Sequence, residues 1–359
     1  APEGVKGISL FIVPKILESG ERNNVHCVGL EHKLGIHASP TAVMQYDEAT
    51  GYLVGEAHQG LKYMFTMMNN ARLSVGLQGV AVSERAHQQA VAYAKDRVQG
   101  YTIEDPSREK TTILHHPDVR RMLSESAALV YGGRALTYYA AAQLDRVTLG
   151  DKGAQAKVDI LTPLVKGWCT DLSERVTSLN IQVHGGMGFA EETGAAQLYR
   201  DARILPIYEG TNGIQANDLT FRKTVRDDGA MITAFIEEML GEIETIKKSD
   251  KGKDDIGALA QPVQNALTDA LTAKDDIITQ AKENLRYAAA ASYPYMTLMA
   301  KATTGFILLK GLSRVDRGAA LSKRHQALSE AFIYLHMADI PALFTQVRNN
   351  GVITEKQIF

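Results

Sequence analysis

The chain has 359 residues, of which 45% are hydrophobic and 22% are charged, so it can bury two or three hydrophobic cores. Its formal net charge of -2 at pH 7 argues against nucleic acid as a partner. No apolar run approaches the roughly 20 residues that a membrane span needs, and no signal-peptide pattern is present. We therefore expect a protein of the cytoplasm or the mitochondrial matrix, in which Cys27 and Cys169 are buried free thiols.

Residues 1–55 are predicted to form antiparallel β-structure, because short runs with β-character are separated by turn residues. His26, His32 and His37 fall in this region without the paired spacing of zinc ligands, so we expect no metal site. The four predicted strands are 7–13, 24–30, 41–46 and 52–54.

The next part of the chain has apolar residues at helical intervals instead of alternating ones. The first pattern predicts one long helix, or two if Gly76 or Gly79 bends it. The second begins at Pro117, a residue that favours the first turn of a helix. Three long antiparallel helices with short connections form a bundle. The three predicted helices are 60–98, 117–149 and 154–179.

Four more amphipathic patterns follow beyond Phe221, where the composition changes. A charged segment at 247–255 is predicted to be a solvated linker. The fold class we expect is mainly α: a partial antiparallel β-domain (1–55), a helical bundle (56–226) and an appended helical bundle (227–359), the last of about 130 residues. The appended patterns fall within 232–246, 263–285, 295–312 and 327–347.

The stretch 180–215 contains the candidate catalytic group. A glycine-rich hinge leads to Glu209, which stands between Tyr208 and Gly210. Because glycine lets a ligand approach the backbone closely, Gly210 would leave one side of the carboxylate open, as a catalytic base requires. The alternative is that Glu209 caps the following helix, and Thr211 offers its hydroxyl either to a cofactor or as that helix N-cap.

Six short segments follow one another along the chain: LGIHASPT at 34–41, NNAR at 69–72, YAKDR at 93–97, QVHGGMGF at 182–189, YRDAR at 199–203, and IYEGT at 207–211 with Gln215. They resemble, in order, the motifs of the acyl-CoA dehydrogenase family, flavoenzymes that oxidise the α,β bond of acyl-CoA thioesters. The resemblance extends from residue 1 to about residue 225. A strand of the kind predicted at 7–13 lies partway through the family's β-domain, so we expect the chain to be the C-terminal part of a longer protein. The missing part would hold the N-terminal helices and the segments around the isoalloxazine ring.

The resemblance implies a reaction and a cofactor, FAD. Glu209 would remove the α proton of an acyl-CoA while hydride passes to flavin N5, giving a trans-2-enoyl-CoA. Electrons would then pass to an electron-transfer flavoprotein. The residues implied to bind the cofactor are Arg97, His116, Gln182, Gly185, Gly186 and Thr211. Those implied to bind the substrate are Asn69, Arg72, Tyr208 and Gly210, although Arg72 has the alternative of being a surface residue.

In the family the arginine at the place of Arg97 meets a flavin bound mainly by the other subunit, which implies a homodimer or homotetramer. The appended helices resemble a larger subgroup to which the 3-methylmercaptopropionyl-CoA dehydrogenases belong, so that thioester is a candidate substrate. Two alternatives remain open. One is an acyl-CoA oxidase that uses O2, and the other is a non-catalytic helical interaction fragment that lacks the flavin cradle.

Overall fold

The computed structural model describes residues 1–104, 106–249, 255–315 and 320–356 of the chain. It divides into two compact units, Ala1–Arg72 and Leu73–Phe359. Among the described residues, no helix is both long and apolar enough to cross a membrane. The mainly α fold class is confirmed.

The first unit contains the predicted antiparallel β-structure as two separate two-stranded sheets. Strand β1 (Leu10–Ile12) pairs with β4 (Tyr52–Val54), and β2 (Val25–Leu30) pairs with β3 (Ala42–Tyr46). A short 3-10 helix, η1 (Gly4–Gly7), precedes them.

Two side chains of this unit show what holds it together and what it leaves open. Buried Asn23 donates hydrogen bonds to the carbonyls of Pro14 and Thr50, at 2.9 and 2.8 Å, so it ties two loops together. The prediction that Cys27 is buried is wrong, because it lies in β2, whose residues are mostly exposed. Cys169 is buried, as predicted, and both thiols are free.

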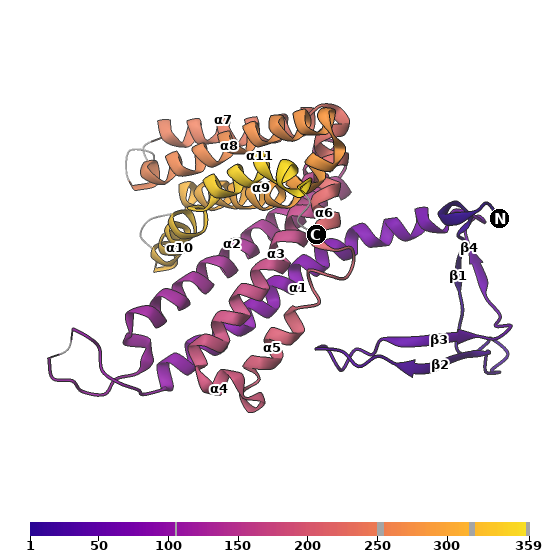
Figure 1. The fold of residues 1–359 in the computed structure, drawn as a ribbon, viewed down its shortest axis with the longest axis horizontal. Helices are drawn as coiled ribbons and strands as arrows, with labels where there is room; N and C mark the ends of the chain where they lie inside the picture. Colours follow the sequence, from indigo (N-terminus) through magenta and orange to yellow (C-terminus); the bar gives the residue numbers. More distant parts are fainter. Residues whose placement is uncertain (105, 250–254, 316–319, 357–359) are drawn as a thin grey trace. The chain divides into compact units, whose positions relative to one another are not determined.

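The structure contains the three long helices that the sequence predicts: α1 (Gly60–Asp96), α2 (Pro117–Thr148) and α3 (Ala154–His184). From Leu73 onward, α1 lies beside α2 and α3 within the second unit (Figure 1). The alternative in which a glycine divides α1 is wrong. A Cβ at Gly76 would lie 2.4 Å from Val165 Cγ1, and one at Gly79 would lie 2.2 Å from the Cys169 carbonyl oxygen. These glycines therefore serve to bring α1 and α3 close together.

Shorter elements connect this bundle to the C-terminal helices. The connecting elements are η2 (Ile113–His115), α4 (Gly186–Phe189), η3 (Glu191–Thr193), α5 (Ala195–Ala202), α6 (Asn212–Asn217), the π-helix η4 (Asp218–Thr224) and η5 (Val225–Asp227). The C-terminal helices are α7 (Ala230–Lys248), α8 (Asp255–Glu283), α9 (Leu285–Arg314), α10 (Ala320–Ala331), the π-helix η7 (Phe332–His336) and α11 (Ile340–Thr354).

One appended helix differs from its prediction. The helix predicted at 327–347 is wrong, since α10 ends at Ala331 and a new helix begins at Ile340. Pro341 explains the break, because proline suits a first turn but cannot continue a preceding helix. The predicted linker at 247–255 falls mostly at 250–254, which lie outside the described residues.

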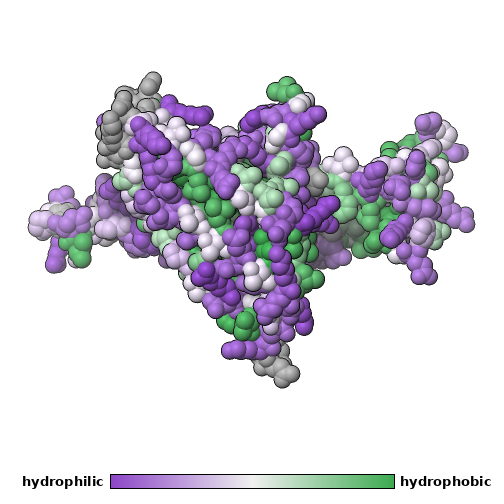
Figure 2. Space-filling model, turned by 90° about the horizontal axis from the view of Figure 1, so that it is seen from above, coloured by the Kyte–Doolittle hydropathy of each residue, from purple (hydrophilic) through white to green (hydrophobic). Residues whose placement is uncertain are grey.

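The main hydrophobic core runs from α2 and α3 into α7, α8 and α9. Leu164 and Trp168 of α3 belong to the same buried cluster as Tyr295 and Phe306 of α9. Figure 2 shows hydrophilic side chains over most of one face, with smaller apolar areas between them, as amphipathic helices produce. The domain boundaries near 55 and 226 remain predictions.

Candidate active site

Glu209 lies in a tight turn between α5 and α6. The turn is closed by two backbone hydrogen bonds, from Tyr208 N to the Ile204 carbonyl at 3.0 Å and from Asn212 N to the Pro206 carbonyl at 2.9 Å. Glu209 has a φ of 54° and Gly210 a φ of 86°, so two successive residues are left-handed. This conformation is unfavourable for glutamate and natural for glycine, so the surrounding contacts must stabilise it.

The Glu209 side chain is half-buried. Within the described part of the chain, neither its carboxylate nor its backbone N–H has a hydrogen-bond partner. The neighbouring Tyr208 hydroxyl donates a hydrogen bond to Gln78 of α1, and burial raises the pKa of Tyr208 above its ordinary value. A carboxylate without a competing partner, held beside an anchored tyrosine, is available to accept a proton.

The start of α6 answers one of the sequence alternatives. Thr211 is the N-cap residue, and its hydroxyl accepts a hydrogen bond from Ile214 N at 3.3 Å. The alternative that Glu209 caps this helix is therefore wrong. Gln215, which is fully buried, donates from Nε2 to the Gly210 carbonyl at 3.4 Å and adds a contact to the turn.

A buried polar network joins the end of the turn to α3. It is centred on Asn212, which is 4% exposed. Its Oδ1 accepts from Lys166 Nζ at 2.9 Å, and its Nδ2 donates to Asp171 Oδ1 at 2.7 Å. Nδ2 also lies 2.9 Å from the Gly167 carbonyl and from the Thr170 hydroxyl. The amide thus stands between a buried ammonium group and a carboxylate, with its oxygen toward the cation.

The outer end of this network reaches an appended helix. Tyr293 of α9 donates from its hydroxyl to Asp171 Oδ2 at 2.6 Å. Burial raises the pKa of Asp171 to about 6, although the hydrogen bonds from Tyr293 and Asn212 act in the opposite direction. Burial likewise raises the pKa of Tyr293 above its ordinary value. A second tie comes from Arg203, which pairs with Glu174 of α3 at 3.1 Å at the start of the turn.

Five of the six residues predicted to bind the cofactor lie at another place, where α1 and α3 end and α2 begins. The exception is Thr211, which belongs to the Glu209 turn. The rings of Tyr93 and His184 stack with their centroids 4.2 Å apart and so join the ends of α1 and α3. Arg97 follows the end of α1 and has an exposed side chain. His116 contacts the Gln99 carbonyl through Nε2 at 2.7 Å.

At the end of α3, Gln182 is exposed and two glycines follow it. Gly185 has a φ of 59° and a ψ of -138°, a conformation open mainly to glycine. A Cβ at Gly185 or at Gly186 would meet no atom within 4 Å, so the backbone there is open to a ligand. Gly188 differs, because its Cβ would lie 2.3 Å from the Ile181 carbonyl oxygen, and it therefore serves the packing of the turn.

The structure does not bring all the predicted site residues together. Tyr208 contacts α1 at Gln78, whereas Arg97 follows the end of the same helix. From Gln78 to Asp96 the helix is roughly 27 Å long at 1.5 Å per residue. The Glu209 turn and the Arg97 end are therefore two separate groups on one bundle.

The predicted substrate residues on α1 lie in the first unit. Asn69 lies within α1, but its side chain lies outside the described part of the structure. Arg72 is only 8% exposed, and its buried Nε has no hydrogen-bond partner among the residues that the structure describes. The alternative that Arg72 is a surface residue is therefore wrong.

Sequence reasoning missed the polar support of the turn. Lys166 and Asp171 fall in the most apolar part of α3, residues 160–172, and a charged residue there is a weak signal of a buried network. Tyr293 gives no such signal, because 122 residues separate it from Asp171. Only the packing of α9 on α3 reveals that contact.

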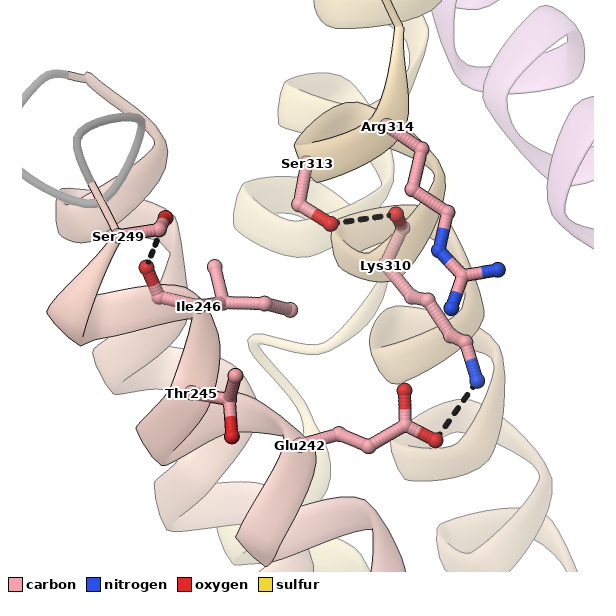
Figure 3. Close-up of a pocket in the computed structure, with 7 residues that line it drawn as sticks. All are labelled: Glu242, Thr245, Ile246, Ser249, Lys310, Ser313 and Arg314. Carbon is pink, nitrogen blue, oxygen red and sulfur yellow. Dashed lines mark hydrogen bonds and ion pairs between the residues drawn. The ribbon is translucent and has the colours of Figure 1, made fainter.

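Two cavities of the second unit lie elsewhere. One, of about 380 Å³, has Trp168, Asp171, Tyr293 and His336 in its wall. The other, of about 250 Å³, lies between α7 and α9, where Glu242 and Lys310 turn toward each other and pair at 2.7 Å (Figure 3). Neither is lined by Glu209. Over the described ranges, no group of three or more His, Cys, Asp or Glu side chains is placed to hold a metal ion.

Comparison with known proteins identifies the family. Residues 58–223 match the family model "Acyl-CoA dehydrogenase, C-terminal domain". A 3-methylmercaptopropionyl-CoA dehydrogenase of Ruegeria pomeroyi is 48% identical over 336 residues, which are 90% of this chain and 56% of that protein. The chain belongs to the acyl-CoA dehydrogenase family. It spans about half the length of the curated relatives that it matches.

Solved structures show the same fold. The Caenorhabditis elegans protein ACDH-11, in complex with C11-CoA, superposes with a TM-score of 0.79 at 21% identity, over 94% of this chain and 54% of that one. An acyl-CoA dehydrogenase of Bacillus anthracis, complexed with FAD, gives a TM-score of 0.75 at 20% identity, over 94% of this chain and 58% of that one. At these identities the likeness establishes the fold alone.

Proposed function

We propose that the protein containing this chain oxidises an acyl-CoA thioester between its α and β carbons, with FAD as the acceptor of the hydride. The observation that carries the proposal is the Glu209 turn. Its carboxylate and its backbone N–H are both without partners among the described residues, and the turn is left-handed at Glu209 and Gly210. Family membership and the relatives that bind an acyl-CoA and FAD support the same reaction.

In this proposal Glu209 removes the α proton at a carboxylate oxygen. The thioester carbonyl accepts a hydrogen bond from the backbone N–H of Glu209, which stabilises the negative charge that develops as the proton leaves. Gly210, which has no side chain, leaves room for the acyl chain beside the carboxylate. The hydrogen bond from Tyr208 to Gln78 orients the tyrosine next to the base. FAD, when bound, supplies the acceptor for the hydride from the β carbon.

The residues around the C-terminal end of α1 have the chemistry to bind a flavin pyrophosphate. Arg97 is exposed and its guanidinium suits phosphate, and the open backbone at Gly185 and Gly186 suits a close approach. Gln182 and His116 complete this group. The hydroxyl of Thr211 accepts from Ile214 N, so its own hydrogen is the part that it would offer to the cofactor.

The distance between the Glu209 turn and the Arg97 group supports a flavin that is bound by residues from two copies of the chain. Because roughly 27 Å of α1 separates the contact at Gln78 from the end of the helix, we assign Arg97 and Glu209 of one copy to two different flavins. The protein would then be at least a homodimer, with a homotetramer as a larger form. Asn69 and Arg72 are assigned to the thioester end of the CoA arm, and an electron-transfer flavoprotein to the removal of electrons.

The relative from Ruegeria pomeroyi makes 3-methylmercaptopropionyl-CoA the first thioester to test. The experiment is anaerobic bleaching of the flavin in the full-length protein, with short, medium, long and methylthio acyl-CoAs. Glu209→Gln is expected to retain acyl-CoA binding and to lose bleaching by roughly 100- to 10,000-fold, the usual contribution of a general base. Glu192→Gln, which changes an exposed glutamate of the same unit, is the matched control.

The same samples separate the other readings. Peroxide formed in air, without any need for an electron-transfer flavoprotein, indicates an acyl-CoA oxidase. A full-length protein that binds no FAD indicates the non-catalytic scaffold. Bleaching that persists at the wild-type rate in Glu209→Gln contradicts the assignment of the base.

A further inference from the structure

We propose that Tyr293 of α9, acting through Asp171 and Asn212, is a positioning residue for the Glu209 turn. The appended helices would then take part in setting the geometry of the base rather than only extending the fold. This inference rests on the proposed function for its consequence in catalysis, but the contacts that carry it do not depend on any ligand.

Asn212 links the Glu209 turn to the buried polar network. Asn212 lies three residues after Glu209, and its backbone N–H closes the turn on the Pro206 carbonyl at 2.9 Å. Its side chain is buried and makes hydrogen bonds from both ends of the amide. A movement of this side chain therefore moves the residue that ends the left-handed turn.

The direction of the Asn212 amide is set by its charged neighbours. Lys166 is fully buried and donates to Oδ1, while Asp171 accepts from Nδ2. If the amide rotated by half a turn, its NH2 group would face the ammonium and its oxygen would face the carboxylate. The buried ammonium and the half-buried carboxylate would then each lose a partner, which is expensive in a poorly solvated site. The charges thus fix one orientation of Asn212.

The Asp171 carboxylate is held in place by a residue of α9. Its Oδ1 is occupied by Asn212, and its Oδ2 accepts from the Tyr293 hydroxyl at 2.6 Å. Hydrogen bonds to an ionised group are among the strongest in proteins. Loss of the tyrosine hydroxyl would free the carboxylate to rotate, and Asn212 would lose its fixed acceptor.

Helix α9 is itself held by close packing against α3 and η4. A Cβ at Gly167 would lie 2.4 Å from Met296 Cε, so α9 lies against α3 one helical turn before Asp171. Buried Tyr295 also lies with its hydroxyl 3.2 Å from Thr224 Oγ1, at the end of η4. The position of Tyr293 is therefore defined by the packing of two residues that follow it closely in α9, Tyr295 and Met296.

Tyr293 is also reachable from outside. It is 45% exposed, and with Asp171 it forms part of the wall of the cavity of about 380 Å³. A substitution there can change the network without touching Glu209 and without opening the core. This makes Tyr293→Phe a mild variant that is expected to fold.

The test measures amide hydrogen exchange over residues 204–212 in the full-length protein, without substrate. Tyr293→Phe and Asp171→Asn are each expected to speed exchange in this segment about tenfold, the effect of losing one hydrogen bond to a charged group. Tyr334→Phe, at an exposed tyrosine of the same appended region, is the matched control and is expected to leave exchange unchanged. Unchanged exchange in Tyr293→Phe overturns the proposal, as does an equal increase along all of α3 and α9.

A double variant tests the order of the chain of contacts. If Tyr293 acts through Asp171, the variant with both substitutions is expected to exchange no faster than the more affected single variant. Effects that multiply would show two independent contributions and would contradict the proposed route.

The catalytic consequence is read separately. Tyr293→Phe is expected to slow flavin reduction about tenfold while the dissociation constant of the acyl-CoA changes less than twofold, because the base is displaced and the binding surface is not. A change in binding alone overturns the catalytic consequence. If Glu209→Gln bleaches normally while Tyr293→Phe still loosens 204–212, the proposed function fails and the positioning of the turn stands.

Discussion

The Glu209 turn and the Arg97 end of the bundle are built in opposite ways. The turn rests on side chains that are almost wholly buried, with Asn212 4% and Lys166 0% exposed. At the other end Arg97 and Gln182 are exposed, and a Cβ at Gly186 would meet nothing within 4 Å. This chain therefore fixes the proposed base by its own folding, whereas Arg97, Gln182 and Gly186 contribute little to the fold.

The largest loss of stability is expected when the buried Asn212 amide is removed. Asn212→Leu leaves Lys166 and Asp171 without their common partner, and it is expected to lower the free energy of unfolding by about 3 kcal/mol. Gln182→Leu, at the exposed end, is expected to change it by less than about 0.5 kcal/mol. Denaturant unfolding of the two variants checks both values. Similar losses in both would show that the two regions are not built differently.

The pH dependence of stability tests the buried support of the Glu209 turn in a second way. Since burial raises the folded-state pKa of Asp171 to about 6, the folded protein holds this proton more tightly than the unfolded chain does between pH ~4 and ~6. The contribution of Asp171 to stability is therefore greatest at low pH and falls as the pH rises through that window, by about 3 kcal/mol.

Asp171→Asn removes this titration. The difference in free energy of unfolding between the wild type and Asp171→Asn, measured by denaturant at a series of pH values, is expected to shift against the wild type from pH ~4 to ~6. Above that range the difference should be constant. A difference that shifts in favour of the wild type as the pH rises would show that hydrogen bonds from Tyr293 and Asn212 outweigh burial.

The smallest effect on stability is expected at the open end. Gly186→Ala adds a methyl group where no atom lies within 4 Å, so the melting temperature should not change. The added group would nevertheless obstruct a pyrophosphate at the backbone, and the affinity for FAD is expected to fall about tenfold. Gly241→Ala, which is equally unobstructed but lies in α7, is the control and should leave FAD affinity unchanged. Equal FAD affinity in all three proteins would remove Gly186 from the cofactor site.

Local patterns in the sequence predicted much of the fold. Helical spacing predicted α1, α2 and α3. The motif around Glu209 marked the candidate base but did not predict the left-handed turn that holds it. The predictions that failed had two causes, tertiary packing in one case and a proline that overrides the apolar spacing in the other. Gly76 and Gly79 mark a close approach of α3, not a bend, and Pro341 divides what the apolar spacing joined into one helix.

The support of the turn was beyond the reach of the sequence for the same reason. Asn212 adjoins a recognisable motif, but nothing in its neighbours indicates a buried lysine 46 positions earlier in the chain. Tyr293 has the spacing of an ordinary helix residue, and its bond to Asp171 exists only because α9 packs on α3. Motifs locate a reacting group, and long-range contacts determine how firmly it is held.

Exchange of the α hydrogens of an acyl-CoA with deuterium from the solvent, followed by proton NMR in the full-length FAD protein, tests the role of Glu209 most directly. The wild type should exchange these hydrogens, and Glu209→Gln should do so at least about 100-fold more slowly, because the acceptor of the proton is gone. Exchange at the wild-type rate in Glu209→Gln would mean that another group takes the proton and that the left-handed turn serves a different purpose.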